Sequence, residues 1–189
     1  MPKRFYELQR LHVDANGSRN SISGIKCTLL GGSSPLGSIT GGTLTKIGSR
    51  CIYPYRNTAT VWNSRVKELK TTADLGYKAF MRLNDFTNES EIAHSIKDSN
   101  VVVSCIGSKA FYKKEKDFED ANINIPIATA KAVKNAKNVK RFIYLSAAGA
   151  DPNSQSARLR TKWIGEQEVK AIYPDVTILR PTYMFNLIE

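Results

Sequence analysis

The segment 26–37 reads KCTLLGGSSPLG and contains the residue types best suited to bind a phosphate group. Its apolar residues are typical of a buried strand, Gly31 permits a tight reversal of the chain, and Pro35 suits the first turn of a helix. Free backbone N–H groups and the positive dipole end at such a helix start favour anions. The turn therefore predicts a nucleotide pyrophosphate as ligand. We expect contacts from Gly31, Ser33, Ser34, Leu36 and Gly37.

Two residues weaken this predicted site. The Cβ of Ser34 obstructs a close approach of the pyrophosphate, and Pro35 has no N–H to donate. Gly32 and the hydroxyl groups of Ser33 and Ser34 can compensate in part. The sequence thus predicts weak nucleotide binding or none.

Three further candidates follow other apolar runs. Arg56 lies 25 residues beyond Gly31 with no acid beside it, and its planar guanidinium suits a 2′-phosphate, so it favours NADP over NAD. Asp85 can hold the adenine amino group or cap a loop, and Gly107 lets the backbone approach a cofactor or serves a turn. For Arg56 the alternative is an ordinary surface arginine after a strand.

Strand-like and helix-like segments alternate along the chain. Strands are predicted at 25–30, 50–53, 79–83, 101–106, 141–146 and 176–179, and helices at 36–47, 89–97, 118–137 and 158–172. The segment 61–69 is a further candidate helix, and 150–157 is a loop by composition. This alternation requires crossovers and predicts an α/β fold, a Rossmann-like doubly wound parallel sheet in the strand order 3-2-1-4-5-6.

The composition fits one globular domain with an excess of positive charge. The 189 residues are 41% hydrophobic, and 28 Lys and Arg against 17 Asp and Glu give a net charge of +11. This charge points to nucleotide phosphates, nucleic acid, anionic lipid or an acidic protein, unless the lysines only solvate helix faces. The longest apolar run, 101–106, is far below the roughly 20 residues that span a bilayer.

The three cysteines are predicted to be buried free thiols. Cys27, Cys51 and Cys105 have neither disulfide-framework nor zinc-site spacing, so we expect no disulfide and no metal.

The N-terminal residues differ in composition from the rest of the chain. Residues 1–23 contain arginines and serines and few acids, which is typical of an N-terminal arm or a mitochondrial presequence, or of an ordinary flexible terminus. The predicted nucleotide-binding domain is then 24–189.

Several stretches together resemble one family. They are SGIKCTLLGGSSPLG, IYPYRN, SNVVVSCIG, DFEDANINIP, VKRFIYLSAAGAD, LRTKWIGEQEV and ILRPTYMF. Over residues 21–189 the chain resembles the short-chain-dehydrogenase-like accessory subunits of mitochondrial respiratory complex I, the NADH:ubiquinone oxidoreductase. In the related dehydrogenases the phosphate-binding turn reads G-x-x-G-x-x-G, and Ser34 replaces its middle glycine.

The resemblance implies an atypical extended short-chain dehydrogenase that holds NADP(H) without turning it over. It places the protein peripherally on the matrix side of the mitochondrial inner membrane. Its partners would be complex I subunits at the junction of the matrix and membrane arms, with contact to anionic lipid and none to nucleic acid. Family members continue past Arg180-Pro181 into a smaller C-terminal lobe. Because this sequence ends at Glu189, we expect a lobe that is absent or truncated: it is encoded elsewhere, or it is lost, or the sequence is a fragment.

The resemblance also locates a missing catalytic residue. Active short-chain dehydrogenases use a Tyr and a Lys four residues apart and a Ser after the fifth strand. Ser146 and Lys162 match, but Arg158 stands in place of the Tyr and cannot act as an acid or base. The resemblance therefore implies no catalytic residue and leaves Ser146 and Lys162 as cofactor contacts, or as a strand-end residue and a helix-surface residue.

Two other functions stay open. One is an NADP-dependent short-chain reductase with an unusual active site, and it requires Lys162 and Ser146 to be essential. The other is a nucleic-acid-binding or redox-sensing module that uses the basic surface. The sequence has no basic motif interleaved with aromatic residues, so support for this second alternative is weak.

Overall fold

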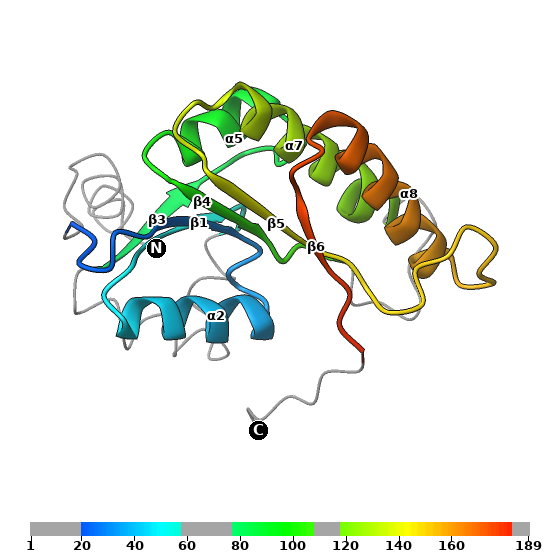
Figure 1. Cartoon of the computed structure of the whole chain (residues 1–189), viewed down its shortest axis with the longest axis horizontal. Helices are drawn as coiled ribbons and strands as arrows, with labels where there is room; N and C mark the ends of the chain where they lie inside the picture. The colour runs from blue at the N-terminus through cyan, green and yellow to red at the C-terminus, as the bar shows by residue number, and fades with distance from the viewer. Residues whose placement is uncertain (1–19, 58–76, 108–117, 183–189) are drawn as a thin grey trace.

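The computed structural model describes residues 20–57, 77–107 and 118–182, and it contains a parallel sheet of six strands (Figure 1). The strands are β1 (Lys26–Leu30), β2 (Arg50–Tyr55), β3 (Lys78–Arg82), β4 (Val101–Ser104), β5 (Arg141–Leu145) and β6 (Thr177–Leu179). Their order is β3-β2-β1-β4-β5-β6, and each neighbouring pair is parallel. The predicted sheet order is confirmed.

Helices cover both faces of the sheet, as a doubly wound fold requires. They are α2 (Pro35–Lys46), α5 (Glu89–Ile96), α7 (Ile125–Asn135) and α8 (Ala157–Ile172), and a short π-helix, η3 (Asp120–Asn124), precedes α7. Of these helices, Figure 1 shows α5, α7 and α8 on one face of the sheet and α2 on the other. The predicted helices at 36–47, 89–97 and 158–172 are confirmed within one residue at each end.

The predicted helix 118–137 is interrupted by the π-helix, and Pro126 supplies the physical reason. An α-helix would pair the N–H of residue 126 with the carbonyl of Asn122, but proline has no N–H. The Asn122 carbonyl instead accepts a hydrogen bond of 3.2 Å from the Tyr144 hydroxyl. Gly165 packs closely against the same carbonyl, because a Cβ at position 165 would lie 1.9 Å from the Asn122 oxygen. The irregular turn is therefore packed against β5 and α8.

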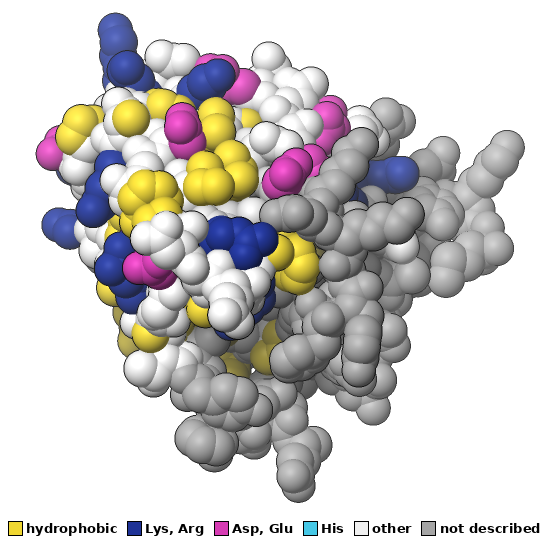
Figure 2. All heavy atoms as spheres, turned by 90° about the vertical axis from the view of Figure 1, so that its right-hand side faces the viewer, with side chains coloured by type: hydrophobic (Ala, Val, Ile, Leu, Met, Phe, Trp, Pro, Cys, Tyr) yellow, Lys and Arg dark blue, Asp and Glu magenta, His cyan; other side chains and the backbone are white. Residues whose placement is uncertain are grey.

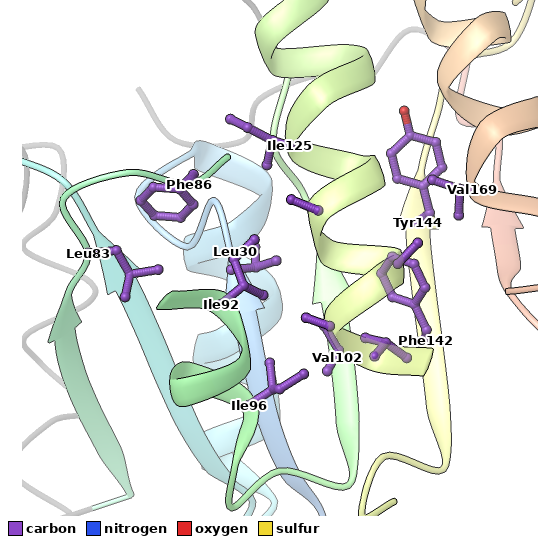
Figure 3. Packing of buried hydrophobic residues seen from close by; sticks show 14 residues of the cluster. Leu30, Leu83, Phe86, Ile92, Ile96, Val102, Ile125, Phe142, Tyr144 and Val169 are labelled. Atoms are coloured by element: carbon purple, nitrogen blue, oxygen red, sulfur yellow. The ribbon is translucent and has the colours of Figure 1, made fainter. Parts of the chain in front are cut away.

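The larger core lies between the sheet and the three helices on its upper face. Figure 3 shows the strand residues Leu30 and Val102 beside Ile92 and Ile96 of α5, and Phe142 of β5 beside α7. All five side chains are fully buried. Burial of this apolar surface supplies the main favourable free energy for the fold.

On the other face, α2 comes unusually close to the sheet. Its sequence, PLGSITGGTLTK, contains three glycines, and a Cβ on Gly41 would lie 1.9 Å from the Tyr53 hydroxyl oxygen. The Tyr53 ring fills the space that larger helix side chains would occupy. The same layer holds the three predicted free thiols, all buried, with Cys27 and Cys51 paired in register on β1 and β2.

Some predictions concern segments outside the described residues. The candidate helix 61–69 and residues 1–19 of the predicted arm belong to these segments. Residues 20–23 are described, and the N–H groups of Ile22 and Ser23 donate to the Gly48 carbonyl at 2.9 and 3.4 Å. Among the described helices, none is long and apolar enough to cross a membrane.

Two adjacent glycines of α2 give a matched test of this close packing. Alanine at position 41 would collide with Tyr53, whereas a Cβ on Gly42 meets no atom within 4 Å. We expect Gly41→Ala to lower the free energy of unfolding by about 1–3 kcal/mol through overpacking. We expect Gly42→Ala to raise it by roughly 0.5–1 kcal/mol, because alanine favours a helix. Urea unfolding of both variants measures this, and equal effects would contradict the packing described.

Candidate nucleotide-binding site

Two glycines fix the turn between β1 and α2. Gly31 has a positive φ of 79°, and a Cβ there would lie 2.9 Å from the backbone of Cys105 and Ile106. A Cβ on Gly37 would lie 2.3 Å from the Gly31 carbonyl oxygen. The end of β1, the start of α2 and the residues after β4 therefore meet at a separation that only glycine permits.

The start of α2 uses much of its own hydrogen-bonding capacity. The Ser34 hydroxyl accepts from the Gly37 N–H at 3.0 Å, so Ser34 is the N-cap of the helix. The Ser34 N–H donates to the Gly31 carbonyl at 2.9 Å, and Pro35 has no N–H. In the first turn, the Leu36 N–H has no partner among the described residues. Fewer amides face a phosphate here than at an uncapped helix start.

A cavity of about 580 Å³ opens beside this turn, at the carboxyl ends of the central strands. It lies where the chain order reverses between β1 and β4, the position at which open α/β sheets bind ligands. Its walls are Gly31, Ser33, Ser34, Pro54, Tyr55, Arg56, Asn57, Phe86, Cys105, Ile106, Gly107 and Ile125. Polar groups and apolar side chains thus share one hollow of the size that small ligands use.

The predicted site residues divide into two groups. Five of them line the cavity: Gly31, Ser33, Ser34, Arg56 and Gly107. The other five lie outside its lining: Leu36, Gly37, Asp85, Ser146 and Lys162. Leu36 and Gly37 belong to the first turn of α2, directly behind the lining residues.

Arg56 contributes a positive charge next to an aromatic surface. Its guanidinium carbon lies 5.9 Å from the ring centroid of Phe86, within the range of a cation–π contact. Arg56 is exposed, whereas Phe86 is buried. A phosphate held by Arg56 and a flat ring held against Phe86 would therefore fit side by side at this end of the cavity.

Asp85 is engaged with its own loop. Its carboxylate accepts from the Thr87 N–H and hydroxyl, each at 2.8 Å. These hydrogen bonds lower its pKa, and the charge of Arg56 adds to the effect. The geometry matches the loop-capping alternative, and the neighbouring Phe86 takes the position on the cavity wall.

Sequence reasoning missed the apolar walls of the cavity. Pro54 and Tyr55 at the end of β2, and Phe86 after β3, adjoin the predicted residues Arg56 and Asp85, so their positions were a usable signal. Ile125 enters from α7, and only the folded chain brings it here. Cys105 lines the cavity with a pKa raised to about 11 by burial, which keeps its thiol protonated and unreactive at neutral pH.

Lys162 is buried and forms a clamp between two strands. Its Nζ donates to the carbonyls of Ile106 and Leu145 at 3.2 and 3.0 Å, and it lies 5.1 Å from the Tyr144 ring centroid. Burial lowers its pKa to about 8, and the positive charge of Arg158 contributes. A Cβ on Gly107 would lie 3.7 Å from this Nζ, so the clamp adjoins the cavity wall.

Three other residues lie near the expected catalytic position: Arg158, Ser146 and Glu166. Arg158 is exposed at the first turn of α8. The Ser146 hydroxyl is buried, and no described residue hydrogen-bonds to it. The buried Glu166 carboxylate pairs with the Arg180 guanidinium, which anchors the chain after β6 to α8. Within the described part of the chain, no three His, Cys, Asp or Glu side chains are grouped to hold a metal.

Comparisons with known proteins give a family and two close relatives. A family model described as "NAD(P)H-binding" matches residues 65–186. The chain is 37% identical over 170 residues to the rat protein "NADH dehydrogenase [ubiquinone] 1 alpha subcomplex subunit 9, mitochondrial" and also to the "NADH-ubiquinone oxidoreductase 40 kDa subunit, mitochondrial" of Neurospora crassa. Each match covers 90% of this chain and 43% of the relative. The chain thus spans less than half the length of these relatives.

A solved structure supports the fold. Yeast methylglyoxal/isovaleraldehyde reductase Gre2, complexed with NADPH, matches with a TM-score of 0.73 and 13% identity. The match covers 85% of this chain and 58% of that one. At this identity the likeness concerns the arrangement of strands and helices alone.

The buried Lys162 predicts a pH dependence of stability. Because folding lowers its pKa from 10.5 to about 8, the unfolded chain binds more protons between these two values. The contribution of Lys162 to the free energy of unfolding therefore rises with pH across this window, by at most about 3 kcal/mol. Denaturant unfolding of the wild type and of Lys162→Met, compared from pH 7 to pH 10.5, isolates this contribution. Parallel curves for the two proteins would contradict it.

Proposed function

We propose, from the premise that this chain belongs to the NAD(P)H-binding family, that it is a non-catalytic accessory subunit of mitochondrial complex I and holds NADP(H) as a structural nucleotide. The observation that carries the proposal is the 37% identity over 90% of the chain to complex I subunits of rat and Neurospora crassa. The cavity at the strand-order reversal supports the nucleotide part.

The residues around the cavity fit such a nucleotide in charge and shape. The backbone at Ser33 and Leu36 would face the pyrophosphate, Arg56 would pair with a 2′-phosphate, and Phe86 and Tyr55 would flank the adenine. Lys162, beside Gly107, would lie nearest the nicotinamide ribose. When bound, NADP(H) supplies a donor or acceptor of hydride. The Ser34 cap and Pro35 withdraw phosphate-binding amides, which supports modest affinity.

The absence of turnover follows from what the residues near the fifth strand can do. Arg158 cannot donate or accept a proton near neutral pH. Lys162 donates two hydrogen bonds to strand-end carbonyls, which leaves one N–H for another partner. Lys162 would then orient a ribose and hold two strands together. The neighbouring Tyr144 phenol donates to the Asn122 carbonyl, and burial raises its pKa, so it would not serve as a catalytic acid.

We further propose a cellular location for the protein. The protein would lie peripherally on the matrix side of the mitochondrial inner membrane, against subunits of the matrix arm near its junction with the membrane arm, and in contact with anionic lipid. Similarity to mitochondrial complex I subunits supports this location. The net charge of +11 suits both acidic subunit surfaces and anionic lipid headgroups.

Arg56 sets the expected preference between the two nucleotides. We expect the wild type to bind NADPH more tightly than NADH, and Arg56→Gln to lower the NADPH affinity about 10-fold while leaving NADH unchanged, because only NADPH carries the 2′-phosphate. Calorimetric titration with both nucleotides measures this. Arg82→Gln, which removes an exposed arginine at the end of β3, is the matched control. An equal loss for both nucleotides would assign Arg56 a structural role instead.

Association with complex I is tested on the native protein. After mild detergent extraction, we expect the full chain to co-migrate with a particle of complex I size, and we expect extracted nucleotide to be NADP(H). A protein that migrates alone and contains no nucleotide would overturn the proposal. Carbonyl reduction by the purified chain that is lost in Lys162→Met would overturn its non-catalytic part.

A further inference from the structure

Basic side chains gather at the end of the sheet where the strands begin, which is opposite the cavity. In a doubly wound fold the strands begin and the helices end at the same end of the sheet, which lies on the left in Figure 1. Seven basic residues lie there, at strand starts, at or just after helix ends, or in the loop before β5, and they are here called the basic edge. They are Lys26, Lys46, Arg50, Lys97, Lys137, Lys140 and Arg141.

Hydrogen bonds hold the segments of the basic edge together. The side-chain Oδ1 of Asn100 accepts a hydrogen bond from the backbone N–H of Lys26 at 2.9 Å. The backbone carbonyl of Asn100 accepts from the N–H groups of Lys140 and Arg141 at 2.8 and 3.3 Å. Asn138 donates to the carbonyls of Ile96 and Ser99 at the end of α5. The starts of β1 and β5 and the end of α5 therefore form one continuous, ordered surface.

The positive charge of this edge has little local compensation. The stretch 121–150 contains five lysines and arginines and no acid. The acids at this end of the strands include Asp98 next to Lys97 and the exposed Asp175 just before β6. Within the described part of the chain, no ion pair involves any of the seven basic residues. Figure 2 shows a different pattern on the opposite side of the molecule, where basic, acidic and hydrophobic side chains are interspersed.

Two exposed isoleucines stand beside these charges. Ile22 is 79% exposed and Ile47 is 57% exposed, and both adjoin Gly48 at the end of α2. The Ile22 N–H donates to the Gly48 carbonyl at 2.9 Å, and a Cβ on Gly48 would lie 3.2 Å from the Ile22 Cβ. The aliphatic groups are therefore held outward by an ordered backbone, next to Lys46 and Arg50.

We propose that the basic edge, with Ile22 and Ile47, docks on an anionic phospholipid bilayer. Lysines attract acidic headgroups, and projecting aliphatic side chains enter the boundary between headgroups and acyl chains. A single-strand nucleic-acid surface would instead interleave its charges with exposed aromatic rings, and no aromatic ring is among the large hydrophobic side chains exposed in the described residues. Charge and apolar side chains together thus select a membrane over a nucleic acid.

This inference gives the lipid contact of the proposed function a definite surface, and it rests on the membrane-side location proposed there. The basic edge lies at the opposite ends of the strands from the nucleotide cavity. Nucleotide binding, co-migration with complex I and lipid binding can therefore fail separately, and each failure is recognisable.

Co-sedimentation of the full chain with vesicles tests the proposal. We expect binding at low salt to phosphatidylcholine vesicles that contain cardiolipin, and little binding to phosphatidylcholine alone. Because each basic residue near an anionic surface contributes about 5-fold in affinity, the double reversal Lys137→Glu/Lys140→Glu should weaken binding by about 30-fold or more. Ile22→Ser/Ile47→Ser should weaken the binding that persists at higher salt.

The matched control makes the same change of charge elsewhere. Lys131→Glu/Arg82→Glu alters two exposed basic residues away from the basic edge and should change vesicle binding less than about 3-fold. Circular dichroism melting checks that all variants remain folded. Equal losses in the edge and control variants, or no binding to anionic vesicles, would overturn the proposal. Equally tight, edge-dependent binding to single-stranded DNA or to polyglutamate would also overturn it, in favour of an acidic polymer as partner.

Discussion

The site depends on one steric constraint, the absence of side chains where β1 turns into α2. Gly31 lies against the backbone after β4, and Gly37 lies against the Gly31 carbonyl. Any Cβ at these positions would push α2 away from the sheet. The constraint brings the ends of β1 and β4 together, and the cavity opens beside their meeting point. A similar constraint applies farther along α2, where the absence of a side chain at Gly41 leaves room for the Tyr53 ring.

Several polar groups near the cavity that could bind a ligand form hydrogen bonds within the protein instead. The Ser34 hydroxyl caps α2, Asp85 caps its own loop, and Lys162 joins the ends of β4 and β5. Burial makes the ammonium group of Lys162 costly to charge, and the nearby charge of Arg158 adds to this cost, which explains the lowered pKa. The proposal of a structural nucleotide in place of an exchanging substrate rests on these internal hydrogen bonds, which engage the groups that catalysis would use.

Much of the fold was predictable from the sequence, because local patterns determine it. Alternating apolar runs and helical periodicity gave the sheet and its order, and the position of Arg56 after β2 placed it at the cavity. The π-helix was not predicted from Pro126 alone, because proline is also common in the first turn of an α-helix. The contacts of the Asn122 carbonyl with Tyr144 and Gly165 arise only in the folded chain. The clamp role of Lys162 and the wall residue Ile125 were likewise missed, because only tertiary packing brings distant segments together.

Hydrogen exchange with and without NADPH tests the central claim most directly, that the cavity beside the glycine turn is the nucleotide site. We predict that NADPH slows amide exchange in the turn at 31–37, at the end of β2 and in the segment after β4, which together line the cavity. Exchange at the basic edge should stay unchanged. Unaltered exchange at the turn, or protection confined to another surface, would contradict the account.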